Sequence, residues 1–383
     1  MAQSVRDDFP STTRNDDLVD ELRARIRHHG PMTFRAFMEA ALYHPRHGYY
    51  VTHADELRPA GDYVTSPQVH PVFGALVAKQ LAHIWDVMSR PARFEIVEQG
   101  AGGGLLARDI VRWARRREPA FAQALAYRIV EPILTARVAQ ERTLSDLARD
   151  VEWLHALPSG IDGVVLSNEL VDAFPVHRVV RRGDELLELY VTERDGRFAD
   201  IEGPPSDARL RAYFDALGVV PGDGCVAEVN LDAVEWMREV GRAVRHGYVL
   251  TFDYGYEAAG LYAPWRRDGT LLCFYRQSAG NDPYARIGEQ DITASVDFTT
   301  LRRTGEAAGL RTLGSTDQAS FLVRMGIGDG LTSAAEDNEM EEYFARREAV
   351  MALLDPARLG RITVLLQGKG VPDAPLTGFA DDR

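Results

Sequence analysis

The chain has little of what a disulfide-stabilised, metal-binding or membrane protein requires. Its only cysteines are Cys225 and Cys273, too few for a disulfide framework or a four-ligand zinc site. The histidines are scattered without metal-ligand spacing. No apolar stretch reaches the roughly 18 residues of a membrane-spanning helix. We therefore expect no bound metal, no membrane span and a reducing compartment.

The chain also has fewer basic than acidic residues, 44 lysines and arginines against 57 aspartates and glutamates, so its formal net charge is −13. This balance argues against a nonspecific nucleic-acid binder, which needs a basic surface to displace counterions. An acidic protein accommodates a cationic substrate well. One predicted helix carries clustered arginines, whose helical spacing is more typical of a solvated face than of a nucleic-acid groove. They are Arg108, Arg112, Arg115, Arg116 and Arg117.

The N-terminal residues have no apolar run and include Asp7, Asp8, Asp16 and Asp17. They resemble neither a secretory signal nor an acid-poor transit peptide, so we predict a cytoplasmic protein. The G-x-S-x-G motif is absent, and no Ser/His/Asp order suggests a serine hydrolase. The length of 383 residues and the apolar fraction of 45% allow two domains or one large decorated domain.

What the chain does contain is a regular alternation of apolar strands and helices. We predict strands at 94–98, 126–131, 151–154, 163–168 and 246–253. We predict helices between them at about 105–117, 134–148 and 231–245. This alternation is typical of an α/β fold with a Rossmann-like parallel sheet, whose ligands bind at the carboxyl ends of the strands.

The remaining segments suggest how the chain is organised. We expect a disordered tail (1–16), an N-terminal helical region (17–90), a Rossmann-like core (91–175 and 225–315), an insertion (176–224), an acceptor-site loop (255–297), and C-terminal helices and a strand (316–370). In the insertion, Arg182-Gly183-Asp184 predicts a β-hairpin, and a helix follows around 206–217. A loop as long as 255–297 is usually functional or disordered.

The most informative motif is the glycine-rich turn that follows the strand 94–98. It reads Glu98-Gln99-Gly100-Ala101-Gly102-Gly103-Gly104. The spacing Glu-x-Gly-x-Gly-x-Gly is typical of class I methyltransferases, which bind S-adenosylmethionine (SAM). Glycines let the backbone approach a ligand closely, and Glu98 can hold the cationic amino group of the methionine part. A dinucleotide site requires G-x-G-x-x-G, and Leu105 stands where its third glycine would be. The alternative is a tight turn without a ligand.

Acidic residues follow other strands of the same sheet. Glu131 can accept hydrogen bonds from both ribose hydroxyls, or it is an exposed acid. Glu169 and Asp172 follow the strand 163–168, and a carboxylate there can hold a guanidinium in a bidentate pair. A guanidinium has a pKa above about 12 and is a poor nucleophile until its lone pair is localised, so one or two carboxylates suit an arginine acceptor. Asp172 alternatively caps the backbone, and Asp253 either completes the acceptor site or braces the loop.

Taken together, these motifs resemble the MidA family of SAM-dependent methyltransferases, which includes a mitochondrial complex I assembly factor that is a protein arginine methyltransferase. The ordered series covers about residues 30–370. Its segments are 61–67, 73–74, 98–104, 130–132, 167–177, 253–255, 269–271, 282–283, 291–294, 296–298 and 367–369.

The resemblance implies a class I SAM-dependent methyltransferase with extra helical elements. It suggests that Thr65, Ser66 and Pro67 fold over the cofactor. It also suggests that the long loop, with Asp282, Pro283, Asp291 and Thr293, closes the acceptor site. The chain departs from the family pattern at Gln99, Ala101, Gly103 and Leu105, and it has Gln277 and Ser295 where other members often have histidines. We expect the cofactor fold to survive these changes, which leave the acceptor's identity open.

Three functions follow from the sequence. The first is methylation of an arginine side chain of a partner protein, and the second is SAM-dependent methylation of a small molecule or another peptide group. The third is a non-catalytic assembly factor with a SAM-binding fold. We predict that the cofactor-binding residues are Thr65, Ser66, Pro67, Glu98, Gly100, Gly102, Gly104, Glu131 and Asn168. The predicted catalytic residues are Glu169, Asp172 and Asp253.

Overall fold

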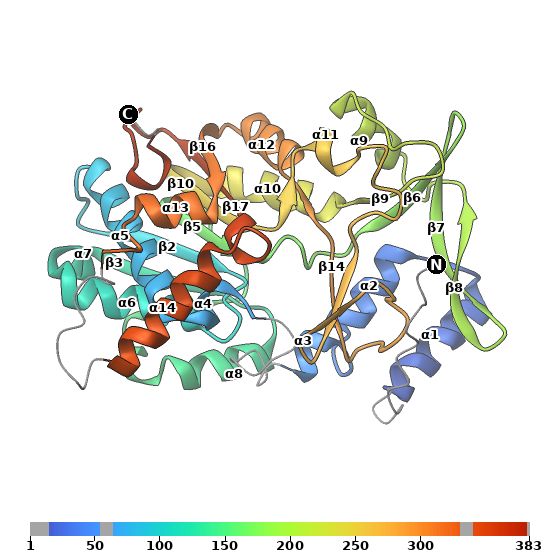
Figure 1. Ribbon diagram of the computed structural model, residues 1–383, viewed down its shortest axis with the longest axis horizontal. Helices are drawn as coiled ribbons and strands as arrows, with labels where there is room; N and C mark the ends of the chain where they lie inside the picture. Colours follow the sequence, from blue (N-terminus) through green and yellow to red (C-terminus); the bar gives the residue numbers. More distant parts are fainter. Residues whose placement is uncertain (1–14, 54–63, 330–339, 381–383) are drawn as a thin grey trace.

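The computed structural model describes residues 15–53, 64–329 and 340–380. Its main element is a seven-stranded sheet with the order β16-β17-β10-β5-β2-β3-β4 (Figure 1). The strands are β2 (Phe94–Gln99), β3 (Leu125–Val130), β4 (Val151–Leu154), β5 (Ile161–Asn168), β10 (Val244–Asp253), β16 (Arg311–Asp317) and β17 (Thr363–Lys369). Strands β4, β3, β2, β5 and β10 are parallel, and β17 is antiparallel to both of its neighbours. The predicted Rossmann-like α/β fold is thus confirmed.

Helices cover both faces of this sheet. They are α4 (Ser66–Val69), α5 (Pro71–Val87), α6 (Leu105–Arg117), α7 (Pro119–Ala124), α8 (Leu134–Thr143), α10 (Leu231–Ala243), α12 (Phe298–Ala307), α13 (Gln318–Arg324) and α14 (Met340–Leu354). Three short 3₁₀ helices are η1 (Ser145–Leu147), η2 (Leu359–Arg361) and η3 (Thr377–Phe379). Among the described residues, no helix is long and apolar enough to cross a membrane.

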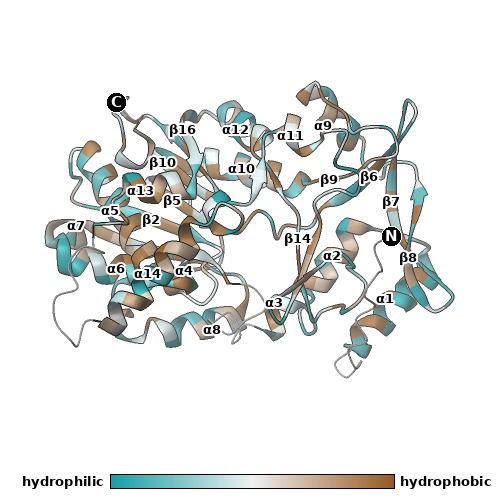
Figure 2. Ribbon diagram, viewed as in Figure 1, coloured by the Kyte–Doolittle hydropathy of each residue, from teal (hydrophilic) through white to brown (hydrophobic). Residues whose placement is uncertain are grey.

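Side chains of each strand alternate between two hydrophobic cores. Leu250 packs with residues of α5, α6, α13 and α14, whereas its neighbour Val249 packs with residues of α10 and α12. Val164 and Val165 in β5 divide in the same way, because successive strand residues point to opposite faces. The strands therefore read as continuous apolar runs, and Figure 2 shows brown along the strands and both brown and teal on the helices that cover them.

A second sheet lies beside the first (Figure 1) and has the order β1-β7-β6-β9, with β8 paired to β7. Its strands are β1 (Met32–Thr33), β6 (His177–Arg182), β7 (Glu185–Arg194), β8 (Arg197–Gly203) and β9 (Val226–Val229). The predicted hairpin turns at Gly183 and Asp184, and α9 (Arg209–Leu217) follows as expected. The hairpin between β7 and β8 was not expected from the sequence. This sheet takes strands from outside 176–224, since β1 and β9 both belong to it.

The N-terminal helices α1 (Asp16–His29) and α2 (Phe34–Tyr43) pack with this second sheet, and α3 (Tyr49–Thr52) packs on α2. The hydroxyl of Thr33 accepts the N–H of Ala36 and caps α2, as the sequence suggests. The predicted disordered tail lies outside the described residues as far as residue 14, and α1 begins at Asp16, inside the expected tail.

The segment 255–297 is largely ordered into short elements. They are β11 (Gly255–Tyr256), α11 (Ala258–Leu261), β12 (Leu272–Tyr275), β13 (Ser278–Gly280), β14 (Asp291–Thr293) and β15 (Val296–Asp297). Strands β13, β12 and β14 form a small antiparallel sheet, and β11 pairs with β15. In Figure 1, β14 lies between the two larger sheets. Its position fixes the residues of this segment that reach the candidate site.

Candidate active site

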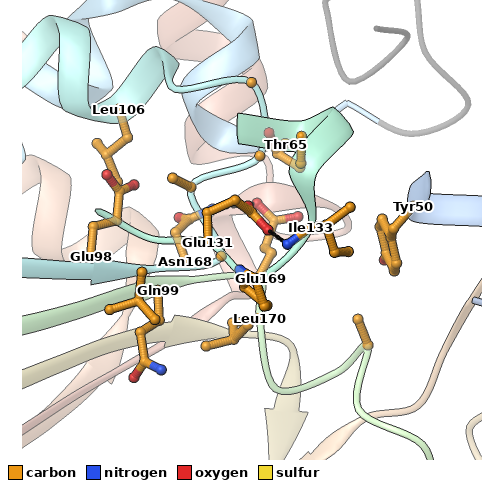
Figure 3. A pocket seen from close by; sticks show the side chains of 18 of the residues that line it. Tyr50, Thr65, Glu98, Gln99, Leu106, Glu131, Ile133, Asn168, Glu169 and Leu170 are labelled. Carbon is orange, nitrogen blue, oxygen red and sulfur yellow. Dashed lines mark hydrogen bonds between the residues drawn. The ribbon is translucent and has the colours of Figure 1, made fainter. Parts of the chain in front are cut away.

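A cavity of about 510 Å³ opens at the carboxyl ends of β2, β3 and β5. Residues that follow these strands line it, together with tyrosines of the N-terminal helices and residues of β14. Figure 3 shows Glu131, Asn168 and Glu169 near the centre of the view, with Glu98 and Tyr50 on opposite sides of them. The cavity therefore lies where parallel α/β sheets bind their ligands.

The glycine-rich turn forms one wall of the cavity. Gly100, Gly102 and Gly104 have φ angles of 73°, 50° and 80°. Residues that carry a Cβ rarely adopt such positive φ angles. A Cβ added to Gly102 would meet no protein atom within 4 Å, so the space beside this backbone is open to a ligand. Gly104 precedes the first residue of α6 and does not line the cavity.

Glu98 lies at the base of this turn and is buried. Its Oε2 accepts a 2.7 Å hydrogen bond from the hydroxyl of Tyr127. Burial raises the pKa of Glu98 to about 7, although the Tyr127 hydrogen bond opposes the rise. A cationic amino group beside this carboxylate would favour its ionised form, so Glu98 suits the amino end of a methionine group.

Glu131 is fixed by two donors at the end of β3. Its Oε1 accepts the N–H of Ile133 at 2.9 Å (Figure 3), and its Oε2 accepts Nε2 of Gln140 at 2.8 Å. Gln140 also donates to the carbonyl of Gly102 at 3.0 Å and accepts from Trp153. Burial raises the pKa of Glu131, while both hydrogen bonds lower it. Gln140, which the sequence did not suggest, thus links the carboxylate to the glycine turn.

Glu169 adopts a left-handed backbone conformation with φ 51°. Such a conformation costs about 1–3 kcal/mol in a non-glycine residue and is frequent at functional sites. Its Oε1 accepts the N–H of Ser66 at 3.2 Å and Nδ2 of Asn168 at 3.0 Å. The hydroxyl of Ser66 instead donates to Gln318, and Ser66 does not line the cavity. Ser66 therefore orients Glu169 through its backbone.

Asp172 adds a second carboxylate on the same side of the cavity. Burial raises its pKa well above the usual range, and the nearby carboxylates of Asp253, Glu169 and Asp291 raise it further. A bound cation would offset this repulsion, because opposite charge favours the ionised carboxylate.

The sequence left two roles open for Asp253, completing the acceptor site or bracing the loop. The hydrogen bonds of Asp253 fit the bracing role. It is fully buried and does not line the cavity. Its Oδ2 accepts the N–H groups of Leu170 and Val171 at 3.2 and 2.8 Å, and its Oδ1 accepts that of Tyr254 at 2.8 Å. Burial raises its pKa to about 7. Asp253 thus holds the turn that carries Glu169.

Two tyrosines of the N-terminal region, Tyr43 and Tyr50, line the end of the cavity that contains Asp291, and sequence reasoning missed them. The hydroxyl of Tyr50 donates to Asp291, and that of Tyr43 donates to the carbonyl of Ala173 at 3.0 Å. The ring centroids of Tyr43 and Tyr50 lie 5.3 Å apart. The only sequence signal was a tyrosine pair directly after Gly48.

The residues proposed from the sequence divide into two groups. Those that line the cavity are Thr65, Pro67, Glu98, Gly100, Gly102, Glu131, Asn168, Glu169, Asp172, Asp291 and Thr293. Those that do not line it are Ser66, Gly104, Asp253, Asp282 and Pro283. Gln99 also reaches the cavity wall, but its Oε1 accepts Nε1 of Trp236 at 3.0 Å.

The lining is strongly acidic. Among the described residues around the cavity, none is a lysine or arginine. The carboxylates are those of Glu98, Glu131, Glu169, Asp172, Glu239 and Asp291. No group of three or more histidine, cysteine or acidic side chains in the described ranges is arranged to hold a metal ion. The cavity is therefore suited to organic cations.

These residues fit S-adenosyl-L-methionine. The open space beside Gly102 can take the methionine chain, Glu98 its amino group, and Glu131 the ribose hydroxyls. Oδ1 of Asn168 is buried without a hydrogen-bond partner in the described structure, so a donor from a ligand would satisfy it.

Comparisons with known proteins agree with this fit. A family model described as "Putative S-adenosyl-L-methionine-dependent methyltransferase" matches residues 76–316. The chain is 28% identical to "Protein arginine methyltransferase NDUFAF7 homolog, mitochondrial" of Drosophila melanogaster, over 95% of this chain and 88% of that protein. It is 27% identical to "Protein arginine methyltransferase NDUFAF7, mitochondrial" of Homo sapiens, over 90% and 81%.

A solved structure is more similar still. The crystal structure of a Burkholderia thailandensis protein bound to S-adenosyl-homocysteine has a TM-score of 0.87 and 32% identity, and it covers 97% of this chain and 98% of that chain. A native structure from the same organism has a TM-score of 0.86 and 31% identity.

Proposed function

The chain belongs to the family of S-adenosyl-L-methionine-dependent methyltransferases, and we propose that its methyl acceptor is an arginine side chain of a partner protein. The observation that carries the proposal is the meeting of Glu169, Asp172 and Asp291 on one side of a cavity whose described lining has no lysine or arginine. The relatives named as protein arginine methyltransferases support it.

The carboxylates would bind and orient the guanidinium. Glu169 is held in place by the N–H of Ser66 and the amide of Asn168, so it can receive two N–H donors of the guanidinium without rearrangement. The rings of Tyr43 and Tyr50 line the same end, where they can stabilise a cation through their π faces.

When bound, S-adenosyl-L-methionine supplies a methyl group on a positively charged sulfur. A guanidine nitrogen lone pair forms the new N–C bond, the S–C bond breaks with its electrons remaining on sulfur, and the nitrogen loses one proton. The products are methylarginine, S-adenosyl-homocysteine and that proton. Asp172 lines the same end of the cavity as Glu169, and once the bound cation favours its ionised form, its carboxylate can receive the proton.

The test is transfer of labelled methyl groups from SAM into proteins of the host lysate, followed by hydrolysis and mass spectrometry. We expect methylarginine with the wild-type chain and only background with Glu169→Gln. Glu348→Gln, which alters an exposed acid on α14 outside both cavities, is the matched control and should retain transfer. Label found only in a small molecule or another amino acid would overturn the arginine assignment in favour of the alternative acceptors.

We also propose a cytoplasmic location, a reducing compartment in which Cys225 and Cys273, both free thiols in the structure, would stay reduced. The named relatives are mitochondrial proteins, so the alternative location is the mitochondrion. Fractionation of host cells that express the full chain with a C-terminal tag tests it, and recovery in an organelle fraction would contradict the proposal.

A further inference from the structure

A second cavity, of about 550 Å³, adjoins the first. Asp172 and Thr293 line both cavities. The two spaces therefore meet at the carboxylate that we place beside the acceptor nitrogen. The cofactor side lies on one side of Asp172, and the second cavity extends away from it.

The second cavity has the form of a groove between two separate parts of the chain. One wall comes from the small sheet and includes Leu272 and Phe274 of β12 and Ala279 of β13. The other wall comes from the end of α14 and from η2 and includes Ala352 and Leu359. Leu272 is 45% exposed, so the groove reaches the protein surface along its sheet wall.

The outer part of the groove is basic, in contrast to the acidic inner end. Arg358 and Arg361 line it and are exposed. Within the described ranges, neither forms an ion pair with a carboxylate. Arg361 donates to the hydroxyl of Tyr256 at 2.6 Å, which holds the guanidinium without neutralising it. Oδ1 of Asp355, which also lines the groove, accepts the N–H of Ala357 and closes its own turn.

We propose that this groove receives the polypeptide on either side of the acceptor arginine, with an acidic side chain of that polypeptide against Arg358 and Arg361. The inference rests on the proposed arginine methylation and narrows its substrate class to an arginine with a nearby aspartate or glutamate in an extended segment. A free guanidine would need only the first cavity. The second cavity is of similar size and is basic at its outer part. It can therefore hold the residues that flank the acceptor arginine when these residues include an acidic side chain.

The test uses a synthetic peptide library with one fixed central arginine, in which each flanking position carries glutamate, glutamine or lysine, together with free arginine. We expect the wild-type chain to methylate glutamate-containing peptides with a kcat/KM about tenfold higher than lysine-containing ones, since two surface charge pairs are involved. The double variant R358E/R361E should invert this preference. Free arginine should be the poorest acceptor.

Arg116→Glu is the control for charge reversal, because Arg116 is exposed on α6 outside both cavities. It should leave the peptide preference unchanged. Calorimetry with S-adenosyl-homocysteine and a melting curve establish that the double variant is folded and binds the cofactor product.

The outcomes separate the two proposals. Methylated arginine without a charge preference, a preference that R358E/R361E retains, or free arginine used as well as peptides would each overturn the groove assignment and leave arginine methylation standing. Absence of methylarginine in every arm, with cofactor binding intact, would overturn the proposed function and this inference with it.

Discussion

The hydroxyl of Tyr50 donates a 2.8 Å hydrogen bond to Oδ1 of Asp291 and joins residues 241 positions apart in the chain. Tyr50 belongs to α3, which packs on α2, and Asp291 begins β14. Both line the cavity beside the glycine turn of the seven-stranded sheet. The acceptor side is therefore assembled from segments outside the cofactor-binding part of the fold.

Replacing Tyr50 with phenylalanine should impair acceptor binding more than cofactor binding. The variant removes one donor from the Asp291 carboxylate, a loss of about 1.5 kcal/mol, so we expect kcat/KM for the acceptor to fall about tenfold. Affinity for SAM, measured by calorimetry, should change less than about twofold. Tyr190→Phe is the matched control, since its hydroxyl bonds the carbonyl of Pro204 on the exposed surface. An equal loss in kcat/KM for the acceptor and in affinity for SAM would contradict the assignment of Tyr50 to acceptor binding.

Glu169→Gln should abolish transfer while the cofactor still binds. The amide keeps the shape of the side chain but loses the charge that orients the guanidinium, so we expect kcat to fall by about 10²–10³. The dissociation constant of S-adenosyl-homocysteine should stay within about twofold of wild type. Equilibrium dialysis and single-turnover kinetics measure the two quantities separately. A variant that loses both together would place Glu169 in the cofactor site instead.

Gly102→Val should prevent cofactor binding. A branched side chain would occupy the open space beside this backbone, and overpacking of about 3 kcal/mol corresponds to at least about 100-fold weaker binding. Gly160→Val is a strict control, because Gly160 also has a left-handed φ of 74° and open space around its Cβ position but does not line the cavity. Both variants should lose similar stability in melting experiments, and only Gly102→Val should lose SAM binding. Weak binding by both variants would attribute the effect to backbone strain.

Cofactor affinity should increase with pH between about 5.5 and 7.5. The pKa of Glu98 is raised to about 7, so below pH 7 the carboxyl is mostly protonated and must lose its proton before it can hold a cationic amino group. We expect affinity to rise up to about tenfold per pH unit below 7 and to level off above it. Titrations by calorimetry across this range measure the slope.

Two variants identify the group responsible for that slope. Glu98→Gln should give weak binding that is independent of pH in this range. Tyr127→Phe should move the midpoint to higher pH, because the hydrogen bond from Tyr127 lowers the pKa of Glu98. A midpoint that does not move in Tyr127→Phe would exclude Glu98 as the titrating group.

The cofactor side of the site could be predicted because its signals are local in sequence. The turn after β2 needs glycines for its backbone angles, and Glu131 and Glu169 follow apolar strands whose carboxyl ends meet at one edge of the sheet. The order of strands and helices alone placed these residues near one another.

The rest of the site depends on contacts that no local pattern encodes. Tyr43 and Tyr50 reach the cavity because α2 packs against the second sheet and β14 and because α3 packs on α2. Asp253 ends a parallel strand as Asn168 does, but three backbone N–H groups turn its carboxylate toward the neighbouring loop. The ordering of 255–297 arises from pairings such as Phe274 with Asp291, which sequence periodicity does not specify.

The position of β17 has a consequence for how the protein is made. This strand, Thr363–Lys369, lies between β10 and β16, which precede it in the chain. On the ribosome, β10 and β16 are made before β17, so the edges of both strands that face β17 stay unpaired until it has been made. Until β17 is in place, the unpaired edges of β10 and β16 can associate with strands of other copies. A stop codon before β17 would remove an interior strand of the sheet and not an edge strand.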